Sequence, residues 1–166
     1  MRIALLGNLG NTAYNFTKML RRKGIDADAY VSRSEQAAPA GGPAWEDAEI
    51  ADQPPSWTYY YGDRNPVSML QLLAKLRRYD LVHACASSIL FSQFAGTPVV
   101  AHALGTDMKE MAYYRNLRGY LMRRGFHNAS SVLYSDLDHV PHISKLQLEG
   151  ARYAVSYTHL TLPTKA

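Results

Sequence analysis

The sequence contains a single cysteine, Cys85, and no apolar run of the roughly 18 residues that a membrane-spanning helix needs. One cysteine cannot form a disulfide within the chain, which is typical of proteins that work in a reducing compartment. The amino terminus also lacks the pattern of a signal peptide, because the short apolar run that begins at Ile3 ends at Gly7. Together these absences predict a cytoplasmic protein.

Neither low-complexity tracts nor internal repeats are present, and the composition is that of a globular protein. Hydrophobic residues make up 47% of the chain and charged residues 19%, which differs from the composition of disordered chains. A length of 166 residues suits one α/β domain with its own core and is short for two.

The chain carries a formal net charge of +4, and much of the positive charge is clustered. The clusters fall on expected helices or their ends: Lys18-Arg21-Arg22-Lys23, Lys75-Arg77-Arg78 and Arg115-Arg118-Arg123-Arg124. Solvated helix ends explain such clusters, and so does a basic face that contacts anionic lipid at the inner face of the membrane or a phosphate-bearing substrate. No nucleic-acid-binding motif is present, so nucleic acid is not an expected partner.

Short apolar segments alternate with segments of helical spacing along the chain. Five segments are predicted strands: residues 3–6, 25–31, 80–84, 99–103 and 131–134. Apolar residues at helical spacing occur over residues 13–20, 69–76, 89–94, 114–121 and 143–148. The fourth of these places Tyr114, Leu117 and Leu121 toward the core, and Gly125 is expected to end that helix. This alternation predicts a Rossmann-like α/β domain with an open parallel sheet.

Residues 32–56 show little pattern and are rich in Ala, Pro and Gly, so a long loop is expected there. Aromatic side chains lie in and after it: Trp45, Trp57 and Tyr59-Tyr60-Tyr61. They are either packing residues or part of a ligand-binding surface.

In open α/β sheets, ligands bind beyond the carboxyl ends of the strands. The turn after the first predicted strand contains Gly7, Asn8, Gly10 and Asn11, where glycines let the backbone approach a ligand. Its spacing matches neither the dinucleotide fingerprint nor a phosphate loop, and such turns also serve packing alone.

Polar residues also end two later strands. His83 ends the third predicted strand and is either a hydrogen-bonded core residue or a ligand contact. His102 precedes Gly105, Thr106 and Asp107, and Asp107 could either cap the next helix or bind a sugar hydroxyl. No metal-ligand spacing or catalytic triad is evident, and Cys85 is expected to be a small buried residue.

Three segments resemble one family: Met1–Gly7 with its glycine turn, Tyr79–His83, and Thr97–Asp107. Their order and residues are similar to the N-terminal domain of family-4 glycosyltransferases with the GT-B fold, over residues 1–154. In that family the third motif usually ends in His-Gly-Ser/Thr-Asp. Here Leu104 precedes Gly105, and His102 lies two residues earlier on the same strand.

The resemblance implies the acceptor-binding half of a retaining enzyme that transfers sugar from a nucleotide-diphosphate sugar, with no cofactor or metal. The donor would be held mainly by a C-terminal domain that this chain lacks, so the chain alone would be inactive. The residues expected to contact substrate are Gly7, Asn8, Gly10, Asn11, His83, His102, Gly105, Thr106 and Asp107. No catalytic residue is assigned on this domain.

Two other functions fit the same sequence. One is a stand-alone flavodoxin-like module that binds a nucleotide or regulates a partner. The other is a fragment of a nucleotide-sugar epimerase with the GT-B fold. A second α/β domain carrying paired glutamates in a Glu-x7-Glu arrangement would favour the transferase.

Residues 155–166 have no helical period and do not continue the preceding pattern. Residues 155–165 resemble a translated sequencing adapter, so they are predicted to be a non-native tail on a truncated protein. The alternative is a short natural strand, for which the Thr and Tyr residues are suited.

Overall fold

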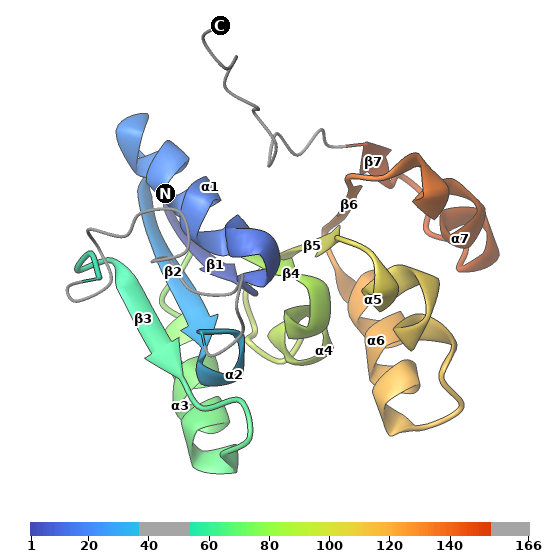
Figure 1. Ribbon diagram of the computed structural model, residues 1–166, viewed down its shortest axis with the longest axis horizontal. Helices are drawn as coiled ribbons and strands as arrows, with labels where there is room; N and C mark the ends of the chain where they lie inside the picture. The colour runs from blue at the N-terminus through green and yellow to red at the C-terminus, as the bar shows by residue number, and fades with distance from the viewer. Residues whose placement is uncertain (37–53, 154–166) are drawn as a thin grey trace, which may run out of the picture.

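The computed structural model describes residues 1–36 and 54–153, which form a seven-stranded parallel sheet with helices packed on it. Neighbouring strands follow the order β3-β2-β1-β4-β5-β6-β7, and every pair is parallel (Figure 1). The strands are β1 (Arg2–Leu6), β2 (Asp26–Ser32), β3 (Thr58–Tyr61), β4 (Leu81–Cys85), β5 (Val99–Ala103), β6 (Ser131–Tyr134) and β7 (Arg152–Tyr153). The predicted Rossmann-like α/β fold is confirmed.

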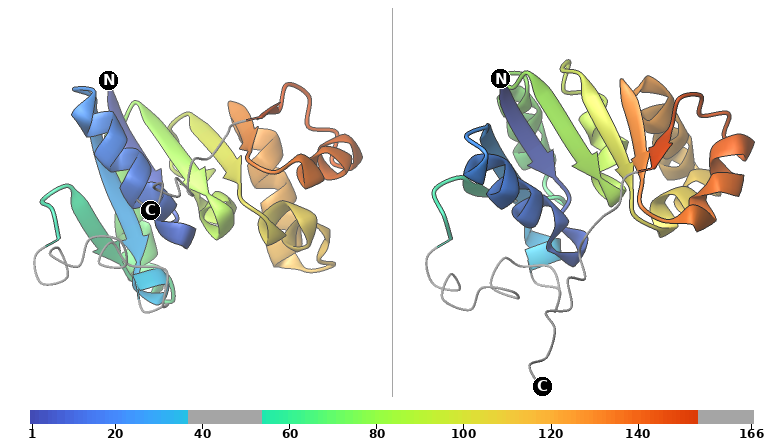
Figure 2. Two further views of the ribbon diagram at one scale, coloured as in Figure 1. Left: turned by 45° about the horizontal axis from the view of Figure 1, so that its top comes forward. Right: turned by 90° about the horizontal axis from the view of Figure 1, so that it is seen from above.

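Helices pack on both faces of the sheet (Figure 2). Their bounds are α1 (Thr12–Arg22), α2 (Arg33–Gln36), α3 (Pro66–Leu76), α4 (Ile89–Ser92), α5 (Thr106–Lys109), α6 (Leu117–Asn128) and α7 (Val140–Lys145). On one face, Ile3 and Leu5 of β1 and Ala27 of β2 pack against Ala13 of α1. The opposite face carries the larger core, to which α3, α4 and α6 contribute the buried side chains Leu72, Leu76, Ile89, Met122 and Phe126.

Two strands, β3 and β7, and one short helix, α2, were not expected from the sequence. β3 includes the tyrosine run, in which Tyr61 is buried in the core and Tyr59 stacks on Tyr30 with ring centroids 5.2 Å apart. Trp57 stacks on Tyr14 of α1, with a centroid distance of 5.1 Å. These aromatic residues therefore pack against the domain. Trp45 and the predicted tail at 155–166 lie outside the described residues.

The helical segment after β5 also differs from the prediction. It is divided into α5, a 3-10 turn at Met111–Tyr113 and α6, and Tyr114 and Leu117 are 39% and 71% exposed instead of facing the core. Gly125 does not end α6. It lies within the helix, where a Cβ atom would come 2.7 Å from the carbonyl oxygen of Ile89, so its missing side chain lets α6 pack closely on α4.

The helices are short: within the described residues, none has both the length and the apolar character needed to span a bilayer.

Candidate functional site

The sheet brings the predicted ligand-binding segments to one edge. β1, β4 and β5 are neighbours in a parallel sheet, so the turn after β1, the end of β4 and the turn after β5 lie at the same carboxyl edge. The strand order reverses between β1 and β4, since β2 lies on one side of β1 and β4 on the other. This is the switch point at which open α/β sheets bind ligands. The two glycine turns therefore lie at the same edge of the sheet.

The turn after β1 is held by its own side chains and by close packing. Gly7 has φ +82°, and a Cβ atom there would overlap the carbonyl oxygen of Cys85 at the end of β4. Asn8 is buried; its Oδ1 accepts from the Tyr14 amide at 2.9 Å, and its Nδ2 donates to Asn11 Oδ1 at 2.9 Å. The outward part of the turn is formed by Leu9, which is 55% exposed, and by Gly10, where an added Cβ atom would meet open space.

The turn after β5 also combines a buried supporting residue with residues that face outward. Asp107 is buried, and its carboxylate accepts from the amides of Leu104 at 3.2 Å and Gly105 at 2.7 Å. Burial raises the pKa of Asp107, while these amide hydrogen bonds lower it. Asp107 lies inside α5 and is not its N-cap, which is Gly105. Thr106 is exposed, and open space surrounds Gly105, so these two residues provide the outward surface of the turn.

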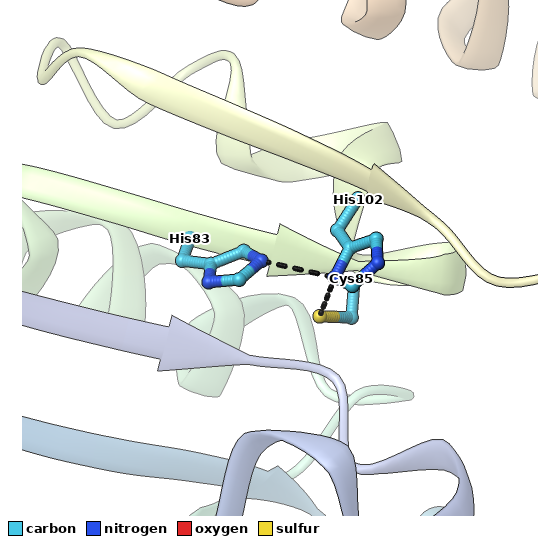
Figure 3. Close-up of side chains that lie close together, drawn as sticks. All are labelled: His83, Cys85 and His102. Atoms are coloured by element: carbon cyan, nitrogen blue, oxygen red, sulfur yellow. Dashed lines mark hydrogen bonds between the residues drawn. The ribbon is translucent and has the colours of Figure 1, made fainter. Parts of the chain in front are cut away.

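His83 and His102 come together on the face of the sheet that α1 covers. His83 Nε2 lies 3.2 Å from His102 Nδ1, and the two rings stack with centroids 5.3 Å apart (Figure 3). Cys85 Sγ lies 3.9 Å from the same His102 nitrogen. The ring of Phe16, on α1, lies 5.6 Å from the His83 ring and 6.0 Å from the His102 ring. The expectation that Cys85 is a small buried residue is confirmed.

Burial keeps both imidazoles neutral at physiological pH. It lowers the pKa of His83 to about 3, with a further lowering from neighbouring His102. Burial likewise lowers the pKa of His102 to about 4, with an added effect from His139. Desolvation penalises the charged imidazolium, so each ring has a lone pair on one nitrogen and a proton on the other. The pair can accept hydrogen bonds or bind a metal ion, but it is not a source of positive charge.

A polar cavity lies at the same edge, beyond the ends of β2 and β3. It has a volume of about 540 Å³ and is lined by residues that follow the two strands: Arg33, Ser34, Gly62, Asp63, Arg64 and Asn65. The Ser34 hydroxyl donates to Asp63 Oδ2 at 2.6 Å, which joins the two sides of the cavity. Two guanidinium groups beside a carboxylate suit a ligand that carries both hydroxyl and anionic groups.

Sequence reasoning did not find this cavity or the place of Cys85 beside the histidines. The cavity was missed because β3 was not recognised, so the residues after it were not treated as a strand end. A signal for Cys85 does exist in the sequence. Alternate residues of a strand share one face, so a strand that contains both His83 and Cys85 places their side chains on the same face.

No protein-family model matches this chain, and no curated protein matches it either.

Proposed function

We propose that residues 1–154 form the acceptor-binding half of a retaining glycosyltransferase that uses a nucleotide-diphosphate sugar. The observation that carries the proposal is the grouping of both glycine turns and the polar cavity at the carboxyl edge of a sheet with Rossmann order. The resemblance of Met1–Gly7, Tyr79–His83 and Thr97–Asp107 to family-4 enzymes supports the same function.

The site has the chemistry of a binding surface more than that of a catalytic centre. Gly10, Gly105 and Thr106 offer backbone groups and one hydroxyl, while Arg33 and Arg64 offer positive charge. Such groups can orient hydroxyls and anionic groups of an acceptor, and retention of configuration does not require a base on this domain. Of the nine predicted contact residues, Gly10, Gly105 and Thr106 face outward. The other six support the site from within: Gly7, Asn8, Asn11, His83, His102 and Asp107.

The strand order argues against the flavodoxin-like alternative. Flavodoxin-like sheets have the order 2-1-3-4-5, with one strand beyond β1, whereas here both β2 and β3 lie on that side. The epimerase alternative shares the GT-B fold, so the fold favours neither it nor the transferase.

The decisive experiment is to read the genomic DNA beyond the codon for residue 154. The proposal predicts an open frame that encodes a second α/β domain with paired glutamates in a Glu-x7-Glu arrangement. A stop codon soon after Gly150 would instead support a stand-alone module, and a second domain without the glutamate pair would favour the epimerase.

We also propose that α6 and the segment before it contact an anionic membrane surface. Leu117 and Tyr120 are 71% and 53% exposed, and Arg115 and Arg118 are exposed beside them. Apolar side chains flanked by arginines are suited to the boundary between lipid headgroups and acyl chains. Other members of the basic clusters have structural partners: Arg21 pairs with Asp26 and Asp28, and Arg123 donates to the carbonyl oxygen of Ala112.

A further inference from the structure

We propose that His83, Cys85 and His102 form a binding site for Zn²⁺ on the face of the sheet beneath α1. One ligand atom from each residue, a ring nitrogen of each histidine and Sγ of Cys85, lies within 4.8 Å of the other two (Figure 3). Two imidazoles and one thiolate are a ligand set that zinc accepts. The proposed sugar transfer requires no metal, although two of these ligands, His83 and His102, also support the proposed acceptor surface.

The parallel sheet fixes this arrangement. His83 and Cys85 are two residues apart on β4, so their side chains point to the same face. Cys85 and His102 are Cα partners in the register between β4 and β5, which places the third ligand directly beside the second. All three backbone positions thus belong to two hydrogen-bonded strands, a rigid support for a metal site.

The distances are close to those around a tetrahedral zinc ion. Zinc bonds of about 2.0–2.3 Å to nitrogen and sulfur place neighbouring ligand atoms about 3.3–3.6 Å apart. The His83 Nε2–His102 Nδ1 distance is 3.2 Å and the Cys85 Sγ–His102 Nδ1 distance is 3.9 Å. Two of the three ligand pairs thus lie near tetrahedral spacing, and the third pair, His83 and Cys85, lies within 4.8 Å. A tetrahedral ion held by these three ligands has a fourth position for water or another ligand.

Metal binding fixes the protonation states of the three ligands. Zinc binds neutral imidazole and thiolate. Coordination needs the imidazole protons on His83 Nδ1 and His102 Nε2, so the hydrogen bond between the rings is exchanged for two zinc–nitrogen bonds. The Cys85 thiol loses its proton to solvent as the zinc–sulfur bond forms. Each bound ion therefore releases one proton from the protein near neutral pH.

A cobalt titration of the whole chain tests the proposal directly. Co²⁺ takes the place of Zn²⁺, and a thiolate ligand gives it a charge-transfer absorption band in the near ultraviolet. We expect this band to saturate at one equivalent of Co²⁺ and to vanish when Zn²⁺ is added. In weakly buffered solution, Zn²⁺ should release about one proton per chain. Absence of the charge-transfer band at one equivalent would overturn the proposal without any variant.

Three variants locate the ion. Cys85→Ala should abolish the charge-transfer band, and His102→Gln should weaken Zn²⁺ binding at least about tenfold in competition with a chelating dye. The matched control is His127→Gln, since His127 is exposed on α6 and should leave both measurements unchanged. Circular dichroism establishes that each variant is folded. Full-strength Zn²⁺ binding by a folded Cys85→Ala, His102→Gln double variant would place the ion elsewhere and contradict the proposal.

Discussion

Gly7 and Cys85 lie in direct contact across the switch point between β1 and β4, with the α-carbon of Gly7 facing the carbonyl oxygen of Cys85. A side chain at Gly7 would meet this oxygen, and the Ser88 hydroxyl oxygen would be 3.1 Å away. The Ser88 hydroxyl donates to that same carbonyl oxygen at 2.7 Å. The glycine thus lets the turn after β1 and the turn after β4 meet at the base of the proposed ligand site.

Gly7→Ala should therefore destabilise the domain strongly. The substitution combines a steric conflict with backbone strain at φ +82°, for an expected loss of about 2–5 kcal/mol in the free energy of unfolding. Gly24→Ala is the matched control, because Gly24 has φ +77° but open space around it and should lose only about 1–2 kcal/mol. Urea denaturation measures the free energy of unfolding of both variants. Equal losses in the two variants would show that the contact with Cys85 has no energetic role.

Stability should fall as the pH drops from about 6.5 toward 4. An unfolded histidine takes up a proton near its usual pKa of about 6.5, whereas folded His83 and His102 do so only near 3 and 4. Between these values the unfolded chain binds more protons, so acid favours unfolding by up to about 1.4 kcal/mol per pH unit for each histidine.

A double variant isolates this effect from that of the carboxylates. His83→Gln with His102→Gln should show a shallower loss of stability over this pH range than the unmodified chain, in urea denaturation at each pH. His127→Gln removes an exposed histidine and serves as the control. If the slopes of all three proteins coincide, the two imidazoles are not held neutral by burial.

The proposed acceptor surface predicts that substitutions at two exposed positions, at opposite edges of the sheet, change kcat/KM for the acceptor to different extents. Thr106 follows β5 at the carboxyl edge, and Ser130 precedes β6 at the opposite edge. In a protein that includes the proposed C-terminal domain, Thr106→Tyr should lower kcat/KM for the acceptor about tenfold or more by displacing the substrate. Ser130→Tyr should leave kcat/KM within a factor of about two. Equal kinetics for the two variants would remove Thr106 from the binding surface.

Membrane contact through α6 predicts that binding depends on Leu117. The chain should cosediment with vesicles that contain anionic lipid, and added salt should weaken this binding by screening the arginines. Leu117→Gln should lower the partition coefficient about tenfold, because about 1.5 kcal/mol of apolar transfer energy is lost. Leu70→Gln on α3 is the control, since Leu70 is 68% exposed on another helix. Binding that is equal for both variants, or absent at low salt, would contradict the proposed contact.

The sequence predicts the sheet better than it predicts the site. Apolar runs such as Ile3–Leu6 and Val99–Ala103 indicate buried parallel strands, because both of their faces need apolar cover. β3 escapes prediction because Thr58–Tyr61 is short, aromatic and preceded by a long stretch without pattern. Its place in the sheet depends on pairing with β2, which is a tertiary contact.

The roles of individual side chains depended on tertiary contacts as well. The spacing of Asp107 suggested either a helix cap or a sugar contact, but its carboxylate accepts from the amides of Leu104 and Gly105. The pairing of His83 with His102 required the register between β4 and β5, which no local pattern specifies. Sequence motifs placed the candidate residues at one edge of the sheet, whereas the division into supporting and outward residues came from the structure.

Release of nucleotide diphosphate from activated sugars tests the central proposal most directly. The assay compares residues 1–154 with the same chain extended through the second domain that the proposal predicts, over a panel of nucleotide-diphosphate sugars and acceptors. We predict acceptor-dependent release by the extended protein and none by residues 1–154, because the donor-binding half is then missing. Turnover by residues 1–154 alone, or none by the extended protein with any donor, would contradict the account.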